Sequence, residues 1–308
     1  MRALLVSLAL FLCLLTSAGG LTILTYNVEN LFDDRDSGTE YAEYRAPRWG
    51  PERYAAKLAA VARAIRSSCP GGPDLVALQE VENERALEDL GDRLAGLGYR
   101  YRVFVPQPGA ATGVAFLSRL PVLRTHVLSV GSAQRASAGE APLRHIVEIE
   151  VECRGHRLQV LNNHWKARTE GEQKTEPGRR AAAEALARRV GRVLAEDPAA
   201  ELLALGDFNQ NLEELQSWSQ GVGLYDPWVG VPKRQRGSAV FRGAWQTPDH
   251  VLLAPGLLDR RGFTLSRQGL RVVRPGFLLE QGTGFPRRFA AGGTSDHLPL
   301  LLRLRVLR

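Results

Sequence analysis

Residues 202–209 read LLALGDFN, an apolar run that ends in a glycine, a carboxylate and a carboxamide. A short apolar run of this kind is typical of a buried β-strand. The same arrangement appears at residues 21–30, which read LTILTYNVEN, at 74–81, which read DLVALQEV, and at 158–164, which read LQVLNNH. Each of these predicted strands therefore carries polar side chains at its carboxyl end.

Two further polar clusters lie beside the last two predicted strands. Together the six clusters contain Asn27, Glu29, Gln79, Glu80, Asn162, Asn163, His164, Asp207, Asn209, Asp249, His250, Ser295, Asp296 and His297. Burying so many polar groups is costly unless they bind a cation, one another or a substrate. We therefore expect the strand ends to meet in one cleft that binds or transforms a ligand.

Oxygen donors dominate this set and favour a hard cation. Asn27, Glu80 and Asp296 offer oxygens suited to Mg²⁺, with Mn²⁺ as an alternative. No Cys/His spacing suggests zinc. Each residue alone has a structural explanation, because an Asn often forms a turn and a Glu can pair with an Arg. The combination of six clusters is what favours a functional site.

The rest of the chain predicts a layered α/β domain with long functional loops. Helices are expected from residue 51 to the Cys69-Pro70 stop, over 86–97 and over 179–196. Loops are expected over 31–50, 133–142 and 167–178. The remaining strands are expected over 100–105, 113–118, 122–130, 145–153, 156–165, 245–253 and 298–306.

Residues 1–18, MRALLVSLALFLCLLTSA, have the charged start, apolar middle and small-residue end of a secretory signal peptide. We expect one domain over residues 19–308 and a secreted or periplasmic location. No later segment is apolar enough for a membrane helix, and no obligate protein partner is evident. Cys69 and Cys153 remain after removal of the leader, and they either pair or stay as free thiols.

The chain of 308 residues has a formal charge of +7, from 40 Lys and Arg against 33 Asp and Glu. Such a charge favours polyanionic partners, including nucleic acid, anionic lipid and phosphate esters. All but four of the 40 basic residues are arginine, which also fits the composition bias of a GC-rich genome. The charge alone therefore leaves the partner open.

Five motifs in order carry a resemblance to a known family. They are Thr25-Tyr26-Asn27-Val28-Glu29-Asn30, Leu78-Gln79-Glu80-Val81, Asn163-His164-Trp165-Lys166, Gly206-Asp207-Phe208-Asn209 and Ser295-Asp296-His297-Leu298-Pro299. The chain resembles the endonuclease/exonuclease/phosphatase superfamily over about residues 21–306, on the branch of pancreatic deoxyribonuclease and bacterial sphingomyelinase. The resemblance implies a four-layer α/β/β/α sandwich of two packed mixed sheets, with the site at one edge.

The resemblance also implies roles for individual residues. Asn27, Glu80 and Asp296 would hold the metal. Asp207 and Asn209 would orient or deprotonate the attacking water, His164 would contact the phosphate or assist the leaving group, and Asp249 and His297 would form an Asp–His pair. Arg144 and Lys166 are candidate phosphate contacts.

Two catalytic functions remain open at this point. One is a Mg²⁺-dependent nuclease of low sequence specificity, with nucleic acid as its substrate, which residues Tyr41, Tyr44, Arg45 and Trp49 favour if they contact bases and phosphates. The same residues can instead pack their loop onto the domain.

The alternative to a nuclease is a phosphodiesterase or phosphatase acting on a small or lipid phosphate. A lipid enzyme would need an exposed apolar hairpin, for which residues 276–285 are the candidate. A non-catalytic binding protein is disfavoured, because every motif position is filled. DNA against RNA, endo against exo cleavage, and periplasm against medium are not decided by these residues.

Overall fold

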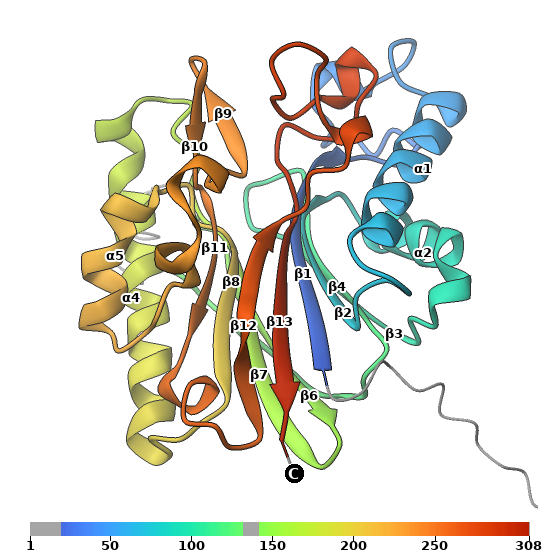
Figure 1. The fold of residues 1–308 in the computed structure, drawn as a ribbon. Coiled ribbons are helices and arrows are strands. Elements are labelled where there is room, and N and C mark those ends of the chain that lie inside the picture. The colour runs from blue at the N-terminus through green and yellow to red at the C-terminus, as the bar shows by residue number, and fades with distance from the viewer. Residues whose placement is uncertain (1–19, 132–141, 308) are drawn as a thin grey trace, which may run out of the picture.

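The computed structural model describes residues 20–131 and 142–307. The predicted signal peptide over residues 1–18 lies outside the described residues, as does almost all of the predicted loop over 133–142. The described residues form two large mixed sheets packed face to face, with helices on both outer faces (Figure 1). The predicted α/β/β/α sandwich is thereby confirmed.

The first sheet has six described strands, and β1 lies near its middle. β1 runs parallel to β2 and antiparallel to β13. The outermost strands are β12 and β3. In order across the sheet the strands are β12 (Phe263–Val272), β13 (Leu300–Val306), β1 (Gly20–Leu31), β2 (Leu75–Val81), β4 (Gly113–Ser118) and β3 (Tyr101–Val105).

The second sheet has five described strands, and its parallel pair is β7 and β8. β8 also pairs antiparallel with β11. In order the strands are β11 (Asp249–Leu253), β8 (Leu202–Asp207), β7 (His156–His164), β6 (Ile146–Cys153) and β5 (Val122–Leu128). A separate two-stranded hairpin is formed by β9 (Ala239–Phe241) and β10 (Ala244–Gln246).

Three apolar clusters hold the layers together. Side chains from the facing sides of the two sheets form the central cluster. The helices α1 (Pro51–Ser67) and α2 (Glu84–Arg93) cover the outer face of the first sheet, and α4 (Glu172–Glu196) and α5 (Leu212–Gly221) cover that of the second (Figure 1). Short 3-10 helices span Ala42–Tyr44, Ala95–Leu97, Pro227–Gly230, Lys233–Gln235, Pro255–Leu257, Gly276–Leu278 and Phe289–Ala291.

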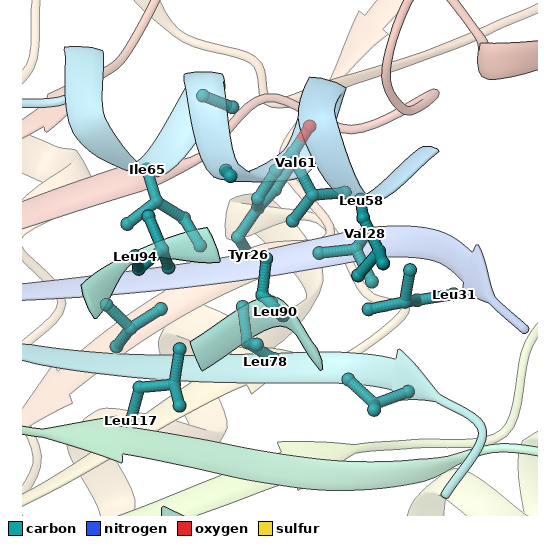
Figure 2. Close-up of a cluster of buried hydrophobic side chains, with 14 of the residues drawn as sticks. Tyr26, Val28, Leu31, Leu58, Val61, Ile65, Leu78, Leu90, Leu94 and Leu117 are labelled. Atoms are coloured by element: carbon teal, nitrogen blue, oxygen red, sulfur yellow. The ribbon is translucent and has the colours of Figure 1, made fainter. Parts of the chain in front are cut away.

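Helix α1 shows how the sequence pattern produces this packing. Pro51 occupies the first turn, where its missing N–H costs no hydrogen bond. Leu58, Val61 and Ile65 recur at helical spacing and pack on the first sheet, where Figure 2 shows them beside Tyr26 and Val28 of β1. Burying a side chain of this size stabilises the fold by about 1.5–3 kcal/mol.

Several predicted boundaries were wrong. Helix α4 starts at Glu172 rather than 179, because the buried guanidinium of Arg179 binds Glu172 and Thr175 and orders the first turns. The strand predicted over 245–253 is interrupted before Asp249, because Pro248 cannot donate to a ladder. Neither α5 nor β12 was predicted.

Two predicted strand pairings are confirmed. Strands β3 and β4 form the expected antiparallel pair, and β6 and β7 form the expected hairpin. Cys69 and Cys153 are both free thiols. None of the helices in the described ranges combines the length and the apolar character that crossing a membrane requires.

Candidate active site

The carboxyl ends of the central strands meet at one edge of the sandwich. In the second sheet Asp207 is in register with His164 on one side and Asp249 on the other. Asn27 of β1 lies across from them, and its Nδ2 is 3.0 Å from Asp207 Oδ2. The two sheets are therefore joined by a direct side-chain hydrogen bond at the predicted site.

Local irregularities of the backbone point the polar side chains toward this site. Glu80 and Asn209 adopt φ angles of +66° and +50°, in the left-handed region that is rare for residues other than glycine. The register between β1 and β2 shifts after Asn27, and that between β2 and β4 shifts after Gln79. Bulges of this kind redirect side chains and are frequent beside active sites.

Gly206 allows β7 and β8 to approach closely just before Asp207. Its φ is +125°, and a Cβ there would lie 2.0 Å from the carbonyl oxygen of Asn163. Because only glycine fits, the GDFN motif combines a packing requirement at Gly206 with a polar group at Asp207.

Asn27 connects two carboxylates. Its Nδ2 donates to Glu80 Oε1 at 3.0 Å as well as to Asp207, and its Oδ1 accepts the backbone N–H of Glu29. The other Glu80 oxygen accepts the backbone N–H of Asn30 at 2.9 Å. Asp207 Oδ1 accepts the backbone N–H of Asn209. The carboxylates are thus held in place by several donors.

The predicted Asp–His pair is present. His297 Nδ1 lies 2.7 Å from Asp249 Oδ2, and the Ser238 hydroxyl donates to the same oxygen at 2.6 Å. His297 Nε2 faces the site and is 4.0 Å from Asp207 Oδ2. Asp249 therefore fixes the tautomer and ring orientation of His297.

Burial and charge set the protonation states. Burial raises the pKa of Asp207 to about 7, and the opposing charge of His297 only partly offsets that effect. Burial alone would lower the pKa of His297, but the carboxylates of Asp249 and Asp207 outweigh it and raise that pKa well above its ordinary value. His297 is therefore cationic at neutral pH, and Asp207 can accept a proton there.

His164 has the opposite character. It is 3% exposed, and burial, with the positive charges of Arg144 and His297, holds its pKa well below the ordinary value. Its Nε2 is 3.6 Å from Glu80 Oε1, while its buried Nδ1 has no partner among the described residues. Arg144 donates to the carbonyl oxygen of Trp165, which also accepts from the Asn209 side chain. His164 and Arg144 thus lie at the site.

The residues present fit a hard divalent cation. The Glu80 carboxylate at the strand end is the donor type that Mg²⁺ prefers. The Asn27 amide lies beside it with Nδ2 toward Glu80 and Oδ1 on the Glu29 N–H, and a rotation of that amide would present its oxygen to a cation there. A second set, Asp207, Asp249 and His297, has ligand atoms within 4.8 Å of one another. In this set His297 Nδ1 and Asp249 Oδ2 already bind each other at 2.7 Å.

Two predicted site residues face other partners. Asp296 is half-exposed and lies 3.4 Å from a guanidinium nitrogen of Arg288, not against Glu80. Lys166 forms a surface ion pair with Glu170, so its ammonium group is engaged at the start of α4. The roles predicted for Asp296 and Lys166 remain predictions.

Other strand-end residues are structural. Gln79 donates to Asn162 Oδ1 at 2.7 Å and so joins the two sheets beneath the site. Asn163 bonds backbone carbonyls of its own sheet. His250 is fully buried between Asp226 and the Gln210 carbonyl oxygen.

Two supporting residues were missed in the sequence. Lys57 is fully buried, and its Nζ donates to the carbonyl oxygens of Glu29 and Thr294, which ties the end of β1 to the loop before His297. The signal was a lysine on the apolar face of α1. Ser238, which binds Asp249, carried no sequence signal.

The aromatic residues of the loop over 31–50 fit different explanations. Trp49 is buried, and its indole N–H donates to the Asp33 carbonyl oxygen. Tyr44 packs between Phe32 and Trp49. Tyr41 meets Phe32 in a T-shaped contact and stays 40% exposed. Packing therefore explains Trp49 and Tyr44, whereas Tyr41 stays partly open to solvent.

Comparisons with known proteins identify a matching family. The family model described as "Endonuclease/Exonuclease/phosphatase family" matches residues 22–306, which is nearly the whole described chain. A comparison with curated proteins found no match.

Solved structures share the fold at low sequence identity. Truncated Caenorhabditis elegans TDP2 superposes with a TM-score of 0.60 at 17% identity, covering 93% of this chain and 98% of that one. An endonuclease/exonuclease/phosphatase from Beutenbergia cavernae gives 0.58 at 18% identity, covering 94% and 72%. D. rerio TDP2, in a structure complexed with single strand DNA product, gives 0.59 at 14% identity, covering 93% and 99%. At these identities the likeness shows the fold alone.

Proposed function

The chain belongs to the endonuclease/exonuclease/phosphatase family, and we propose that it is a secreted, Mg²⁺-dependent phosphodiester hydrolase that acts as a nuclease of low sequence specificity. Members of this family generally hydrolyse phosphoester bonds. The observation that carries the proposal is the convergence of Asn27, Glu80, Asp207 and the Asp249–His297 pair at one sheet edge.

Asp207 is the group that orients and deprotonates the attacking water. A general base works best when its pKa lies near the working pH, and burial places that of Asp207 at about 7. The backbone N–H of Asn209 and the Asn27 amide hold the carboxylate in one orientation. Fixed orientation of the water opposite the leaving oxygen lowers the entropic part of the barrier.

The basic side chains act on the phosphate. His297, cationic and held by Asp249, donates through Nε2 to a phosphoryl oxygen as negative charge grows. Arg144 adds a second positive charge, and neutral His164 donates a hydrogen bond to the phosphate or the leaving oxygen. Mg²⁺ held by Asn27 and Glu80, with Asp296 as the proposed third ligand, would polarise a non-bridging oxygen.

Glu80→Ala is expected to weaken Mg²⁺ binding. The change removes a carboxylate that Asn27 and the Asn30 N–H hold in place, so the half-saturating Mg²⁺ concentration should rise by at least about tenfold. Both the Mg²⁺ dependence of cleavage and calorimetric Mg²⁺ binding would measure this. Glu84→Ala, at an exposed glutamate in the first turn of α2, is the matched control. Wild-type Mg²⁺ affinity in the Glu80 variant would refute the metal assignment.

The structure supports nucleic acid over a lipid substrate. The segment 276–285, the candidate for a lipid-binding hairpin, is packed onto the domain. Leu278 is 2% exposed, and the guanidinium of Arg63 lies 3.8 Å from the Phe277 ring centroid. An apolar hairpin available to a membrane is therefore not found at that segment, while the charge of +7 favours a polyanion.

A substrate panel at two salt concentrations tests the proposed function. Plasmid, single-stranded RNA, sphingomyelin vesicles and a small phosphodiester would each be incubated with Mg²⁺ and with EDTA. Arginine contacts to several phosphates release counterions, so the apparent affinity for plasmid should fall by about tenfold or more between about 50 and 200 mM salt. A small diester should show a much shallower dependence. Preferential, salt-insensitive turnover of sphingomyelin or of the small diester would favour the alternative function.

We further propose that residues 1–18 direct export and that residues 19–308 form one domain. The support is the charged, apolar and small-residue order of the leader. Amino-terminal sequencing of the exported protein should begin at Gly19, and retention of the leader in mature protein would contradict the proposal.

A further inference from the structure

One large apolar side chain stands out from the surface beside the catalytic pair. Phe241 is 63% exposed, whereas the next most exposed large apolar residue in the described ranges, Leu123, is 44% exposed. Phe241 ends strand β9, and Arg242 and Gly243 form the tip of the hairpin. A single exposed apolar residue is common, so its position and support decide whether it has a function.

The hairpin is attached to the catalytic pair through its backbone. Ser238, directly before β9, binds Asp249 through its hydroxyl, and its carbonyl oxygen accepts the N–H of Leu298. Ala239 forms a β-bridge with His297. Because a strand rises about 3.3 Å per residue, the Phe241 Cα lies about 7 Å further along from Ala239. Figure 1 shows β9 and β10 at the end of the molecule where β8 ends and β11 begins.

The face of the hairpin that carries Phe241 is turned toward the residues that follow Asn209. Phe241 pairs with Ala244 and lies on the same face as Gln246, two residues on from Ala244. The Gln246 side chain accepts a hydrogen bond from Asn211, two residues after Asn209.

The opposite face braces the hairpin. The guanidinium of Arg274 lies 4.3 Å from the Trp245 ring centroid, and the Phe285 ring meets Trp245 edge-on at 5.7 Å. Arg274 also donates to the carbonyl oxygen of Gly237 at 2.8 Å. Gly237 has a φ of +112°, and a Cβ there would lie 2.7 Å from the Trp245 ring. The hairpin is thus held in place before any ligand binds.

We propose that Phe241 is a stacking platform for a nucleobase of the substrate, one or two nucleotides from the scissile phosphate. The guanidinium of Arg242 lies over one face of the Phe241 ring, 5.1 Å from its centroid, so a base would stack on the other face, and the guanidinium brings positive charge to the same tip. An exposed aromatic face with an adjacent arginine is the usual means of holding single-stranded nucleic acid without sequence preference. This inference rests on the proposed nuclease function and assigns one residue that binds its substrate.

The chemistry of the tip favours a base over a lipid surface. A membrane-inserting hairpin buries several large apolar side chains in the interface. Here Phe241 is followed by Arg242 and Gly243, and its cross-strand neighbour is only Ala244. One ring with one guanidinium matches one base and its phosphate.

Steady-state cleavage of a single-stranded oligonucleotide would test this. Phe241→Ala should raise KM by about tenfold, since loss of one stacked base typically weakens binding by about 5- to 150-fold, and Phe241→Trp should keep the wild-type KM. On a matched oligomer of abasic residues, wild type and Phe241→Ala should have the same KM. Leu123→Ala, at the exposed Leu123 of edge strand β5, is the control and should change neither.

The outcomes separate this inference from the proposed function. If wild type cleaves neither the oligomers nor plasmid under any divalent condition, the nuclease function fails and the inference with it. If wild type cleaves plasmid but neither oligomer, the inference alone is wrong. If wild type cleaves and Phe241→Ala keeps the wild-type KM, the inference alone is wrong. An equal rise of KM on the abasic oligomer would also overturn it, because the ring would then act without a base. The inference would also be wrong if Phe241→Ala kept its KM for the oligonucleotide but lost binding to sphingomyelin vesicles, because the ring would then contact lipid.

Discussion

Replacing Asp207 with Asn should lower kcat by about 10²- to 10⁴-fold, the range typical for loss of a general acid or base. Asn keeps the size of the side chain and can still accept the N–H of Asn209. It cannot take a proton from water. The expected loss therefore falls on turnover and not on substrate affinity, and it is measured as kcat at saturating Mg²⁺ and substrate.

Stability measurements separate this role from a structural one. The variant loses an acceptor for Asn27 but no longer buries a carboxylate, so the two effects oppose each other and Tm should stay near wild type. Asp74→Asn is a matched control, because Asp74 is also buried but binds Thr22 at the opposite end of β2. Asp74→Asn should keep the wild-type kcat. More than about a tenth of wild-type turnover in Asp207→Asn would show that the residue is not the base.

Replacing His297 with Ala should lower kcat by about 10²- to 10³-fold, the usual cost of one transition-state hydrogen-bond donor. The variant removes the cation that Asp249 holds 2.7 Å away and that faces Asp207. His156→Ala, at the start of β7 and thus at the other end of the sandwich, should keep wild-type turnover. Both variants would be compared in kcat and in Tm.

Combining the two changes tests whether the groups act together. Asp207 and His297 are proposed to act on one transition state, so the double variant should lose less than the product of the single losses. Fully multiplicative losses would indicate separate roles. Failure of His297→Ala to fold would instead assign His297 a structural role.

The sequence predicted the site well where a site residue directly follows the apolar run of a strand. The alternation in residues 21–28 and the apolar run at 202–205 determine two strands, and the strands carry Asn27 and Asp207 to their ends. Gly206 and Asp207 are adjacent, so the close strand approach and the catalytic carboxylate come from one motif. The pairing of Asp249 with His297 was predicted only through the family resemblance.

Side-chain partners outside the motifs were not predictable in this way. Asp296 faces Arg288, and Lys166 faces Glu170, although both belong to the quoted motifs. The start of α4 depends on Arg179, which is buried and binds Glu172. A helical sequence pattern does not reveal that this arginine is buried. For Trp49 the sequence left a ligand contact and packing both open, and packing holds because its indole N–H donates to the Asp33 carbonyl oxygen.

Plasmid cleavage by wild type and Asp207→Asn, purified in parallel, tests the hydrolytic role of this site most directly. Each would be incubated with Mg²⁺ and with EDTA, and relaxed and linear DNA would be quantified over time. We expect Mg²⁺-dependent cleavage by wild type, none with EDTA, and a loss of about a hundredfold or more for Asp207→Asn. The parallel purification excludes a contaminating nuclease as the source of activity. Equal cleavage by both proteins, or cleavage by wild type that persists in EDTA, would contradict the account.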